Sequence, residues 1–223
     1  EGTSELPIYF TSISDDSIGG DTGNDATTTG AVGQWQGLYF KGGSTGELDH
    51  VVVRYAGQGG FGFGDFIGIE NDGGTLTIKN SLIDQNNQHG IWQRAGVLVL
   101  ENTVISNHLF GLTIWSGITT VISNDFVSNS QYGLHASGGD SLNLTDNNFI
   151  DNAKTAYVTA SISFSHIGNN SSDTANRGFE TGGEVRDEAV WHTSDLPFII
   201  NGLTVASGET LTLSKILNKS DKN

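Results

Sequence analysis

The chain contains no cysteine, no methionine and only two prolines among its 223 residues. The absence of cysteine excludes disulfide bonds, thiolate metal sites and cysteine nucleophiles. Because methionine is missing even at position 1, we expect a processed or excised piece of a longer protein, with any signal peptide already removed. The scarcity of proline leaves strand hydrogen bonding uninterrupted, and the 31 glycines supply tight turns between strands.

Basic residues are also scarce. Ten lysines and arginines stand against 25 aspartates and glutamates, which gives a formal net charge of −15. Such a surface repels nucleic acids and anionic membranes and attracts divalent cations, so nucleic acid is not an expected partner. No run approaches the roughly 18–20 apolar residues of a membrane helix, so no membrane insertion is expected. The acidic, cysteine-free surface favours an extracellular or bacterial cell-surface location.

A motif of a small, an apolar and a variable residue recurs five times along the chain at a nearly constant spacing. The five copies begin at Gly68, Gly90, Gly111, Gly133 and Ala156. An earlier copy begins at Gly37, a longer interval before the first of the five. A fixed period of this length marks a stacked-repeat architecture. Within each period the apolar residues alternate with polar ones, which indicates strands.

Three further sets of positions follow the same period. Apolar pairs are predicted to line an interior, because alternate residues of a strand point to the same side. They are Leu76/Ile78, Leu98/Leu100, Thr120/Ile122, Leu142/Leu144 and Ile162/Phe164. Polar residues mark two corners, where asparagine tolerates a left-handed backbone and its amide can bond neighbours above and below. One corner comprises Asn80, Asn102, Asn124 and Asp146, and the other comprises Gln85, Asn107, Asn129 and Asn152.

These patterns predict an all-β fold, a right-handed single-stranded parallel β-helix (a solenoid) of six to eight coils with a period of about 22 positions. Coils should stack about 4.8 Å apart, and the right hand follows from the chirality of parallel crossovers. We expect one domain. Its parts are a first strand and acidic Gly/Asp-rich loop as a cap (1–36), regular coils (37–167), a loop excursion (168–197), a final coil or the start of a further array (198–214) and a polar tail (215–223).

Several segments resemble right-handed β-helix repeat proteins of the pectin-lyase-like family, which occur in large bacterial extracellular and surface proteins. The segments PIYFTS (7–12), DDS (15–17), GGD (19–21) and WQGLYF (35–40) are similar to the beginning of such a helix. LDHVVVRY (48–55) is similar to its first full coil, and LPFIINGLTV (196–205) to the start of a further array. The resemblance implies the fold strongly. It leaves the activity open, because the family includes lyases, hydrolases and non-enzymatic adhesive domains.

An acid-rich loop is the candidate metal site. Asp15, Asp16, Asp21, Asn24 and Asp25 lie close together in the sequence, among glycines and threonines. Calcium takes six to eight oxygen ligands, which a flexible loop of this composition can supply. The spacing lacks the full EF-hand pattern, and a solvated loop held by Asx-turns is the alternative. No organic cofactor is expected.

A column of outward residues is the candidate binding surface. The positions two residues after the start of successive motif copies carry Tyr39, Glu70, Trp92, Thr113 and His135, with Arg94 and Trp115 nearby. Exposed aromatic rings flanked by polar groups stack on sugars and bond their hydroxyls. The alternative is that these side chains cover loops or a neighbouring domain.

The sequence therefore predicts a non-catalytic extracellular module for carbohydrate binding, adhesion or spacing, with a glycan or a neighbouring domain as partner and Ca²⁺ in the amino-terminal loop. Acidic residues on the coils are scattered, so no catalytic residue is assigned. Two alternatives stay open. One is a polysaccharide lyase or glycoside hydrolase acting on acidic polysaccharide, with Lys79 or Arg94 as candidate bases. The other is a purely structural stalk.

Overall fold

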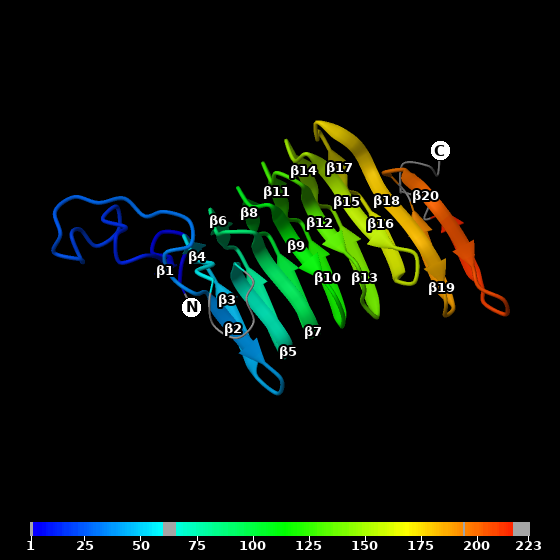
Figure 1. The fold of residues 1–223 in the computed structure, drawn as a ribbon, viewed down its shortest axis with the longest axis horizontal. Helices are drawn as coiled ribbons and strands as arrows, with labels where there is room; N and C mark the ends of the chain where they lie inside the picture. Colours follow the sequence, from blue (N-terminus) through cyan, green and yellow to red (C-terminus); the bar gives the residue numbers. More distant parts are fainter. Residues whose placement is uncertain (1, 60–65, 194, 216–223) are drawn as a thin grey trace.

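The computed structural model describes residues 2–59, 66–193 and 195–215. The described residues form strands and turns only, so no helix among them could cross a membrane. All strand pairs are parallel, and successive rungs lie side by side from the blue end to the red end of the ribbon (Figure 1). The chain winds into a solenoid of about seven coils, which confirms the predicted parallel β-helix.

Each regular coil contributes one rung to each of three faces. The short-strand face contains β1 (Ile8–Phe10), β4 (Val51–Arg54), β6 (Leu82–Asp84), β8 (Val104–Ser106), β11 (Asp125–Val127), β14 (Asn148–Ile150) and β17 (Asn170–Ser171). The aromatic face contains β2 (Leu38–Lys41), the first halves of β5 (Ile67–Lys79) and β7 (His89–Glu101), β9 (Phe110–Ile114), β12 (Tyr132–Ala136), β15 (Lys154–Thr159), β18 (Ala175–Val185) and β20 (Phe198–Val205). The third face contains β3 (Thr45–Asp49), the second halves of β5 and β7, β10 (Ile118–Ile122), β13 (Ser141–Thr145), β16 (Ser163–Ile167), β19 (Ala189–Thr193) and β21 (Leu211–Lys215).

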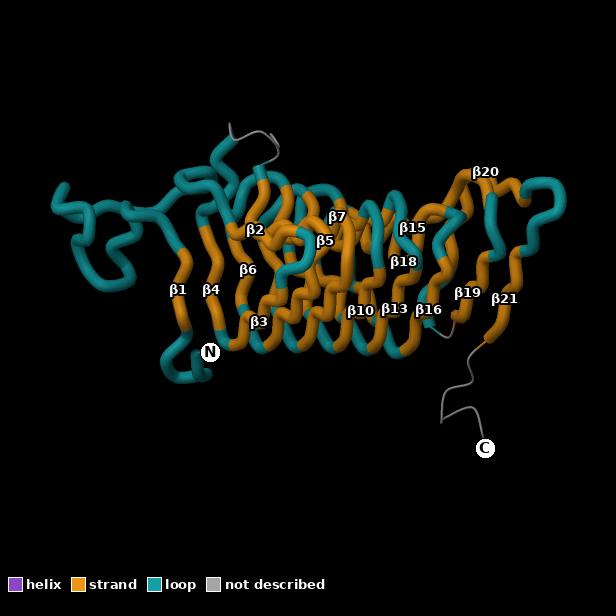
Figure 2. Tube along the Cα trace, turned by 90° about the horizontal axis from the view of Figure 1, so that it is seen from below, coloured by secondary structure: helices purple, strands orange, loops and turns teal. Residues whose placement is uncertain are grey.

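The amino-terminal loop between β1 and β2 projects from one end of the solenoid (Figure 2). At the other end, residues 168–197 were expected to leave the coils as a loop excursion. They instead hold β17, β18 and β19, which pair in parallel with the preceding rungs. The pattern is hard to see in the sequence because β18 pairs with a register shift and the turn before it is polar.

The interior is a continuous apolar column, and the predicted set was wrong in one coil. Leu100 pairs with Val121 and Val121 with Leu144, so Val121, not Ile122, lies inside. Ile122 pairs with Glu101 and Thr145 and is only partly buried. In the same strand, the inward threonine is Thr119 and not Thr120. Further along, Ile162 and Phe164 are both buried in the core, as predicted. The register places Phe164 beside Leu142 and the buried His166 beside Leu144.

A change of coil length explains the slip at Ile122. The step from His89 to its partner Phe110 is one residue shorter than the step from Ile67 to its partner His89. The step from Thr119 to its partner Leu142 is one residue longer, so the original register is recovered. In the coil between the short step and the long step, a constant period therefore points to the residue one position too far along the chain. Because strand residues alternate between faces, this error moves a side chain from the inside to the outside.

The same slip splits each predicted corner ladder into two adjacent columns. Exposed or half-exposed residues with a left-handed backbone form the turn itself. At one corner these are Asn80, Asn102, Ser123 and Asp146, and at the other Gln85, Asn107, Ser128 and Asp151, with φ between 45° and 61°. The next residue in each coil is buried. Asn124, Asn129 and Asn152 belong to these buried columns and not to the positions predicted for them.

The buried columns are hydrogen-bonded ladders that run along the solenoid. Asn147 shows the pattern: its Oδ1 accepts from the backbone N–H of Asn124 (2.9 Å), and its Nδ2 donates to the carbonyl of Val121 (2.9 Å) and to Oδ1 of Asn169 (2.9 Å). The first ladder comprises Ser81, Thr103, Asn124, Asn147, Asn169 and Asp195, and the second comprises Asn86, His108, Asn129, Asn152 and Asp173.

Both ladders end at an aspartate toward the carboxyl terminus. Every internal asparagine accepts from the preceding rung and donates to the following one, so the last member needs only to accept. A carboxylate meets that requirement. The backbone N–H of Asn152 donates to Asp173 Oδ1 (2.9 Å), and that of Asn169 donates to Asp195 Oδ2. Burial alone would raise the pKa of Asp195, but the hydrogen bond from His166 (2.6 Å) and the backbone donors lower it.

Replacing Asn147 with alanine should destabilise the fold by roughly 2–6 kcal/mol, because the N–H of Asn124 and the carbonyl of Val121 both lose this partner, at about 1–3 kcal/mol each. Chemical denaturation measures the loss. The control is Asn143→Ala, an exposed asparagine on β13, which should change stability by less than about 0.5 kcal/mol. Equal effects of the two substitutions would contradict the ladder's role.

His108 makes one ladder sensitive to acid. Its Nε2 accepts from Asn86 Nδ2 (3.2 Å), and its Nδ1–H donates to Asn129 Oδ1 (3.3 Å), so the ring must be neutral. Burial lowers its pKa from 6.5 to about 4. Because the folded-state pKa is the lower one, the stabilisation is complete above pH 6.5 and is lost as the pH falls from 6.5 toward 4.

Between pH 7 and pH 4 we therefore expect His108 to account for about 3 kcal/mol of lost stability. His108→Asn, which introduces the residue found at the next two rungs, should retain that part of the stability at pH 4. Denaturant unfolding at both pH values measures the difference. His50→Asn, at a turn residue outside both ladders, is the control. An identical pH dependence in His108→Asn and the unmodified chain would refute the assignment.

Candidate functional site

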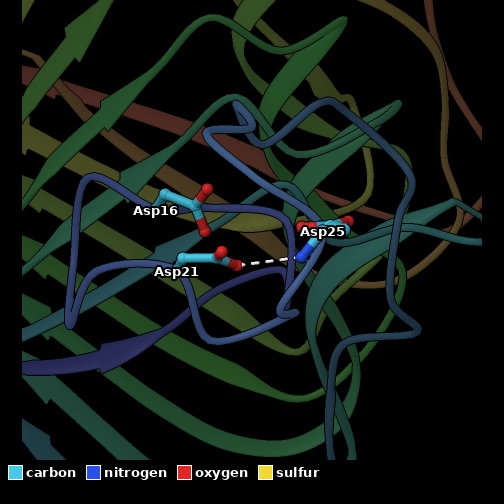
Figure 3. Close-up of side chains that lie close together, drawn as sticks. All are labelled: Asp16, Asp21 and Asp25. Atoms are coloured by element: carbon cyan, nitrogen blue, oxygen red, sulfur yellow. Dashed lines mark hydrogen bonds between the residues drawn. The ribbon is translucent and has the colours of Figure 1, made fainter.

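The amino-terminal loop gathers three carboxylates. One oxygen each from Asp16, Asp21 and Asp25 lie within 4.8 Å of one another (Figure 3). Asp16 Oδ2 accepts from the backbone N–H (2.5 Å) and hydroxyl (3.1 Å) of Thr28, and Asp21 Oδ1 accepts from the N–H of Asp25 (3.1 Å). The other oxygen of Asp16 is buried and has no hydrogen-bond partner within the described part of the chain. Three carboxylates on one loop suit a hard cation.

Asp15, predicted as a ligand, is not in this cluster. Asp15 is 2% exposed and pairs with Arg54 of β4, whose Nε lies 2.7 Å from Oδ2. Burial would raise the pKa of Asp15, but hydrogen bonds from Ser17, Thr11 and Arg54 lower it below its usual value. Asp15 therefore fastens the loop to the first coil. Asn24 has a left-handed backbone (φ 52°), and its role as a ligand stays a prediction.

The predicted outward column exists in the register expected. Tyr39 pairs with Glu70, Glu70 with Trp92, Trp92 with Thr113, and Thr113 with His135. Its exposure differs from the expectation. Glu70, Trp92 and Thr113 are only 2–4% exposed, whereas Tyr39 is 41% exposed. The column is therefore not a continuous strip of accessible aromatic rings.

A second column beside the first explains this burial. His89, Phe110 and Tyr132 occupy successive rungs of the aromatic face, one position before each repeat glycine. Their rings stack at centroid distances of 5.1 and 6.3 Å, and the His89 ring also stacks on Trp92 at 4.9 Å. None of these three residues was predicted from the sequence as part of the binding surface. The signal was available, because an aromatic residue or histidine precedes three consecutive motif glycines.

Because these rings stack face to face, their faces are covered by one another and only their edges can contact a ligand. Trp115 is the exception. It is 48% exposed, lies edge-on to Trp92 at 4.4 Å, and has the Arg94 guanidinium 5.5 Å from its ring centre. Arg94 also pairs with the buried Glu70 at 3.1 Å, which fixes the guanidinium between the two indoles. Trp115 is thus a rigid, accessible indole held by Trp92, Arg94 and Glu70.

The next rungs carry a second cation network. Lys154 lies 5.0 Å over the Tyr132 ring and pairs with Glu180 at 3.2 Å, and the Tyr132 hydroxyl donates to Glu180 at 2.7 Å. The hydrogen bond with Tyr132 and the ion pair with Glu180 raise the pKa of Lys154 above its usual value. Burial and the proximity of Glu180 raise the pKa of Tyr132. Both groups therefore hold their protons at neutral pH.

Histidines on this face are neutral. Burial lowers the pKa of His89 to about 4, with a smaller contribution from His135, and burial lowers the pKa of His135 as well. His89 Nδ1 lies 2.8 Å from the Thr113 hydroxyl, and His135 stacks on Tyr157 at 5.1 Å. Uncharged rings therefore lie beside Arg94 and Lys154, two cations that are each compensated by a glutamate.

Register, ladders and strand order define the class as a parallel β-helix. The chain matches the family model described as periplasmic copper-binding protein (NosD) over residues 6–183, and it belongs to this family. Comparison with curated proteins and with solved structures gives no match. The periplasmic description of the family agrees with the predicted location outside the cytoplasm. The narrower likeness to pectin-lyase-like proteins stays a prediction.

Proposed function

We propose that the chain is a non-catalytic carbohydrate-binding module of the bacterial periplasm or cell surface, used in adhesion or spacing, with Ca²⁺ bound by its amino-terminal loop. The single observation that carries the carbohydrate part is Trp115, which is 48% exposed and held rigidly against Trp92 and Arg94. A fixed indole face beside hydrogen-bonding side chains is a typical sugar platform.

The states of the candidate bases support binding over catalysis. A polysaccharide lyase needs a group that can accept a proton. Lys79 is paired with Glu47 at 2.6 Å, and that contact raises its pKa, so it stays protonated. Lys154 is held protonated in the same way. Arg94 is committed to its ion pair with Glu70. The lyase or hydrolase alternative therefore has no candidate base among these three residues.

The family is described as copper-binding, so copper is a candidate ligand. The side chains of this chain that could bind a metal do not suit copper. Copper sites in proteins typically include thiolate, thioether or imidazole ligands, to which Cu(II) sites add oxygen ligands. The chain has no cysteine or methionine, and no group of three metal-ligating side chains among the described residues includes a histidine. Among the described residues, the only group of three or more metal-ligating side chains is the carboxylate trio Asp16, Asp21 and Asp25. Oxygen-only ligands favour Ca²⁺ or Mg²⁺.

Three arguments support Ca²⁺ in the loop. The carboxylate trio converges within 4.8 Å, one buried oxygen of Asp16 has no partner among the described residues, and the chain is strongly acidic. A cation would relieve the repulsion between the three carboxylates. It would also fix the loop in place at the end of the solenoid.

Trp115→Ala should weaken retention on the glycan that the chain binds by about tenfold or more, because truncated aromatic anchors commonly cost about 2 kcal/mol or more. Affinity electrophoresis in gels containing different polysaccharides measures the change. Ile118→Ala is the matched control, because Ile118 is 47% exposed on the third face. If no polysaccharide retards the unmodified chain, the carbohydrate function fails and a structural stalk becomes the better description.

Calcium should raise the melting temperature relative to chelator. At 100 times the dissociation constant, a ligand specific for the native state adds about 2.7 kcal/mol, or roughly 5–10 °C for a chain of this size. Asp21→Asn combined with Asp25→Asn should abolish the rise, and Asp140→Asn, an exposed acid on a distant turn, should not. Cu²⁺ should give no comparable rise. A melting temperature that Ca²⁺ leaves unchanged, or that Cu²⁺ raises more than Ca²⁺ does, would contradict the proposed Ca²⁺ site in the loop.

A further inference from the structure

A groove follows the corner where the short-strand face turns into the aromatic face. Two adjoining hollows form it, with volumes of about 470 and 410 Å³, and they share Ser130. The turns after β6, β8, β11 and β14 line it in succession, so it crosses four rungs. At about 4.8 Å per rung, three intervals span roughly 14 Å along the solenoid axis. We call this hollow the corner groove.

Amides and hydroxyls dominate its lining. Outside the buried ladder and the aromatic face, its polar side chains are Asn87, Gln88, Asn107, Ser128, Ser130 and Gln131. Asn87 already donates its Nδ2 to the carbonyl of Gly57 (3.1 Å). Within the described ranges, the amide groups of Gln88 and Gln131 make no hydrogen bond, so each offers donors and an acceptor. Asn107 uses its Nδ2 on Asp84 (2.7 Å) and keeps its carbonyl oxygen as an acceptor.

Apolar surface lies beside these groups. Val32 reaches the groove from the amino-terminal loop and is 49% exposed, and Leu109 lies between the exposed amides. Tyr132 borders the second hollow with the edge of its stacked ring. Alternation of apolar surface with amide and hydroxyl groups matches a sugar chain, whose C–H faces and hydroxyls alternate in the same way.

The groove is uncharged on a strongly acidic protein. Lys154 is its only charged lining residue at neutral pH among the described residues, and Glu180 compensates that charge at 3.2 Å. His108 lies in its floor as a neutral ring. The whole chain carries a formal charge of −15, so an anionic polymer gains no local attraction and meets overall repulsion.

We propose that the corner groove binds a neutral polysaccharide strand lying along the solenoid axis. This inference rests on the proposed carbohydrate function and narrows it to uncharged glycans at a site distinct from Trp115. A neutral strand would use the amides of Gln88 and Gln131 and the hydroxyl of Ser130, while its apolar faces contact Leu109 and Tyr132.

Isothermal titration with three neutral hexasaccharides, cellohexaose, laminarihexaose and mannohexaose, tests the site, with hexagalacturonate as the anionic probe. Ser130→Trp fills the junction of the two hollows, and Gln88→Ala with Gln131→Ala removes the free amides. Ser163→Trp is the matched control, because Ser163 lines a hollow of about 230 Å³ on the third face. We expect at least one neutral hexasaccharide to bind, both groove variants to weaken it at least tenfold, and Ser163→Trp and hexagalacturonate to show no effect.

Other outcomes separate this inference from the proposed function. If Ser130→Trp leaves the affinity for a neutral hexasaccharide unchanged while Trp115→Ala removes it, the groove is not the site and the carbohydrate function stands. If only hexagalacturonate binds, the neutral class is wrong. If none of the four probes binds and no polysaccharide retards the chain in gels, both proposals fail. Thermal melting of each variant confirms that it is folded.

Discussion

The structure depends on the hydrogen bonds that buried side chains make between coils. Each ladder asparagine satisfies a backbone N–H in the preceding rung and donates in turn to the following rung, at a corner where the strand ladder is interrupted. Without these amides, the corners would bury unsatisfied backbone groups, whose cost would exceed the marginal stability of a typical domain. The apolar column inside the coils supplies the driving force, and the ladders fix how the rungs are aligned.

The alignment of the rungs determines which side chains lie together on the surface. Residues one coil apart in the sequence become neighbours on one face, so Trp115 meets Trp92 and Arg94 of the preceding coil. Stacking between rungs holds the aromatic rings in place, but it also covers the ring faces, so a ligand cannot reach them. What remains accessible is one indole face at Trp115 and a polar groove at the adjoining corner. These two surfaces, fixed on a rigid scaffold, are the ones that we propose as ligand-binding sites.

Much of the fold could be predicted from the sequence, because the period and the alternation of apolar residues directly specify stacked strands. Errors arose where one coil is a residue shorter than the period and the next a residue longer, since a one-residue slip reverses inside and outside. This misplaced Ile122, Asn124 and Asn129. The candidate site was harder to predict. Its column was placed correctly, but the burial of Trp92 depends on His89 and Phe110 packing beside it, and the capture of Asp15 depends on Arg54 from a distant strand.

Native-state hydrogen exchange at the backbone amides of Thr103, Asn124 and Asn147 tests the central claim most directly. Each of these N–H groups donates to a ladder side chain, at 2.9, 2.9 and 3.0 Å. The account predicts that they exchange only through global unfolding, with protection equal to that of amides within β10 and β13. Exchange orders of magnitude faster than in those strands would show that the corners open independently and that the buried amides do not hold the coils in register.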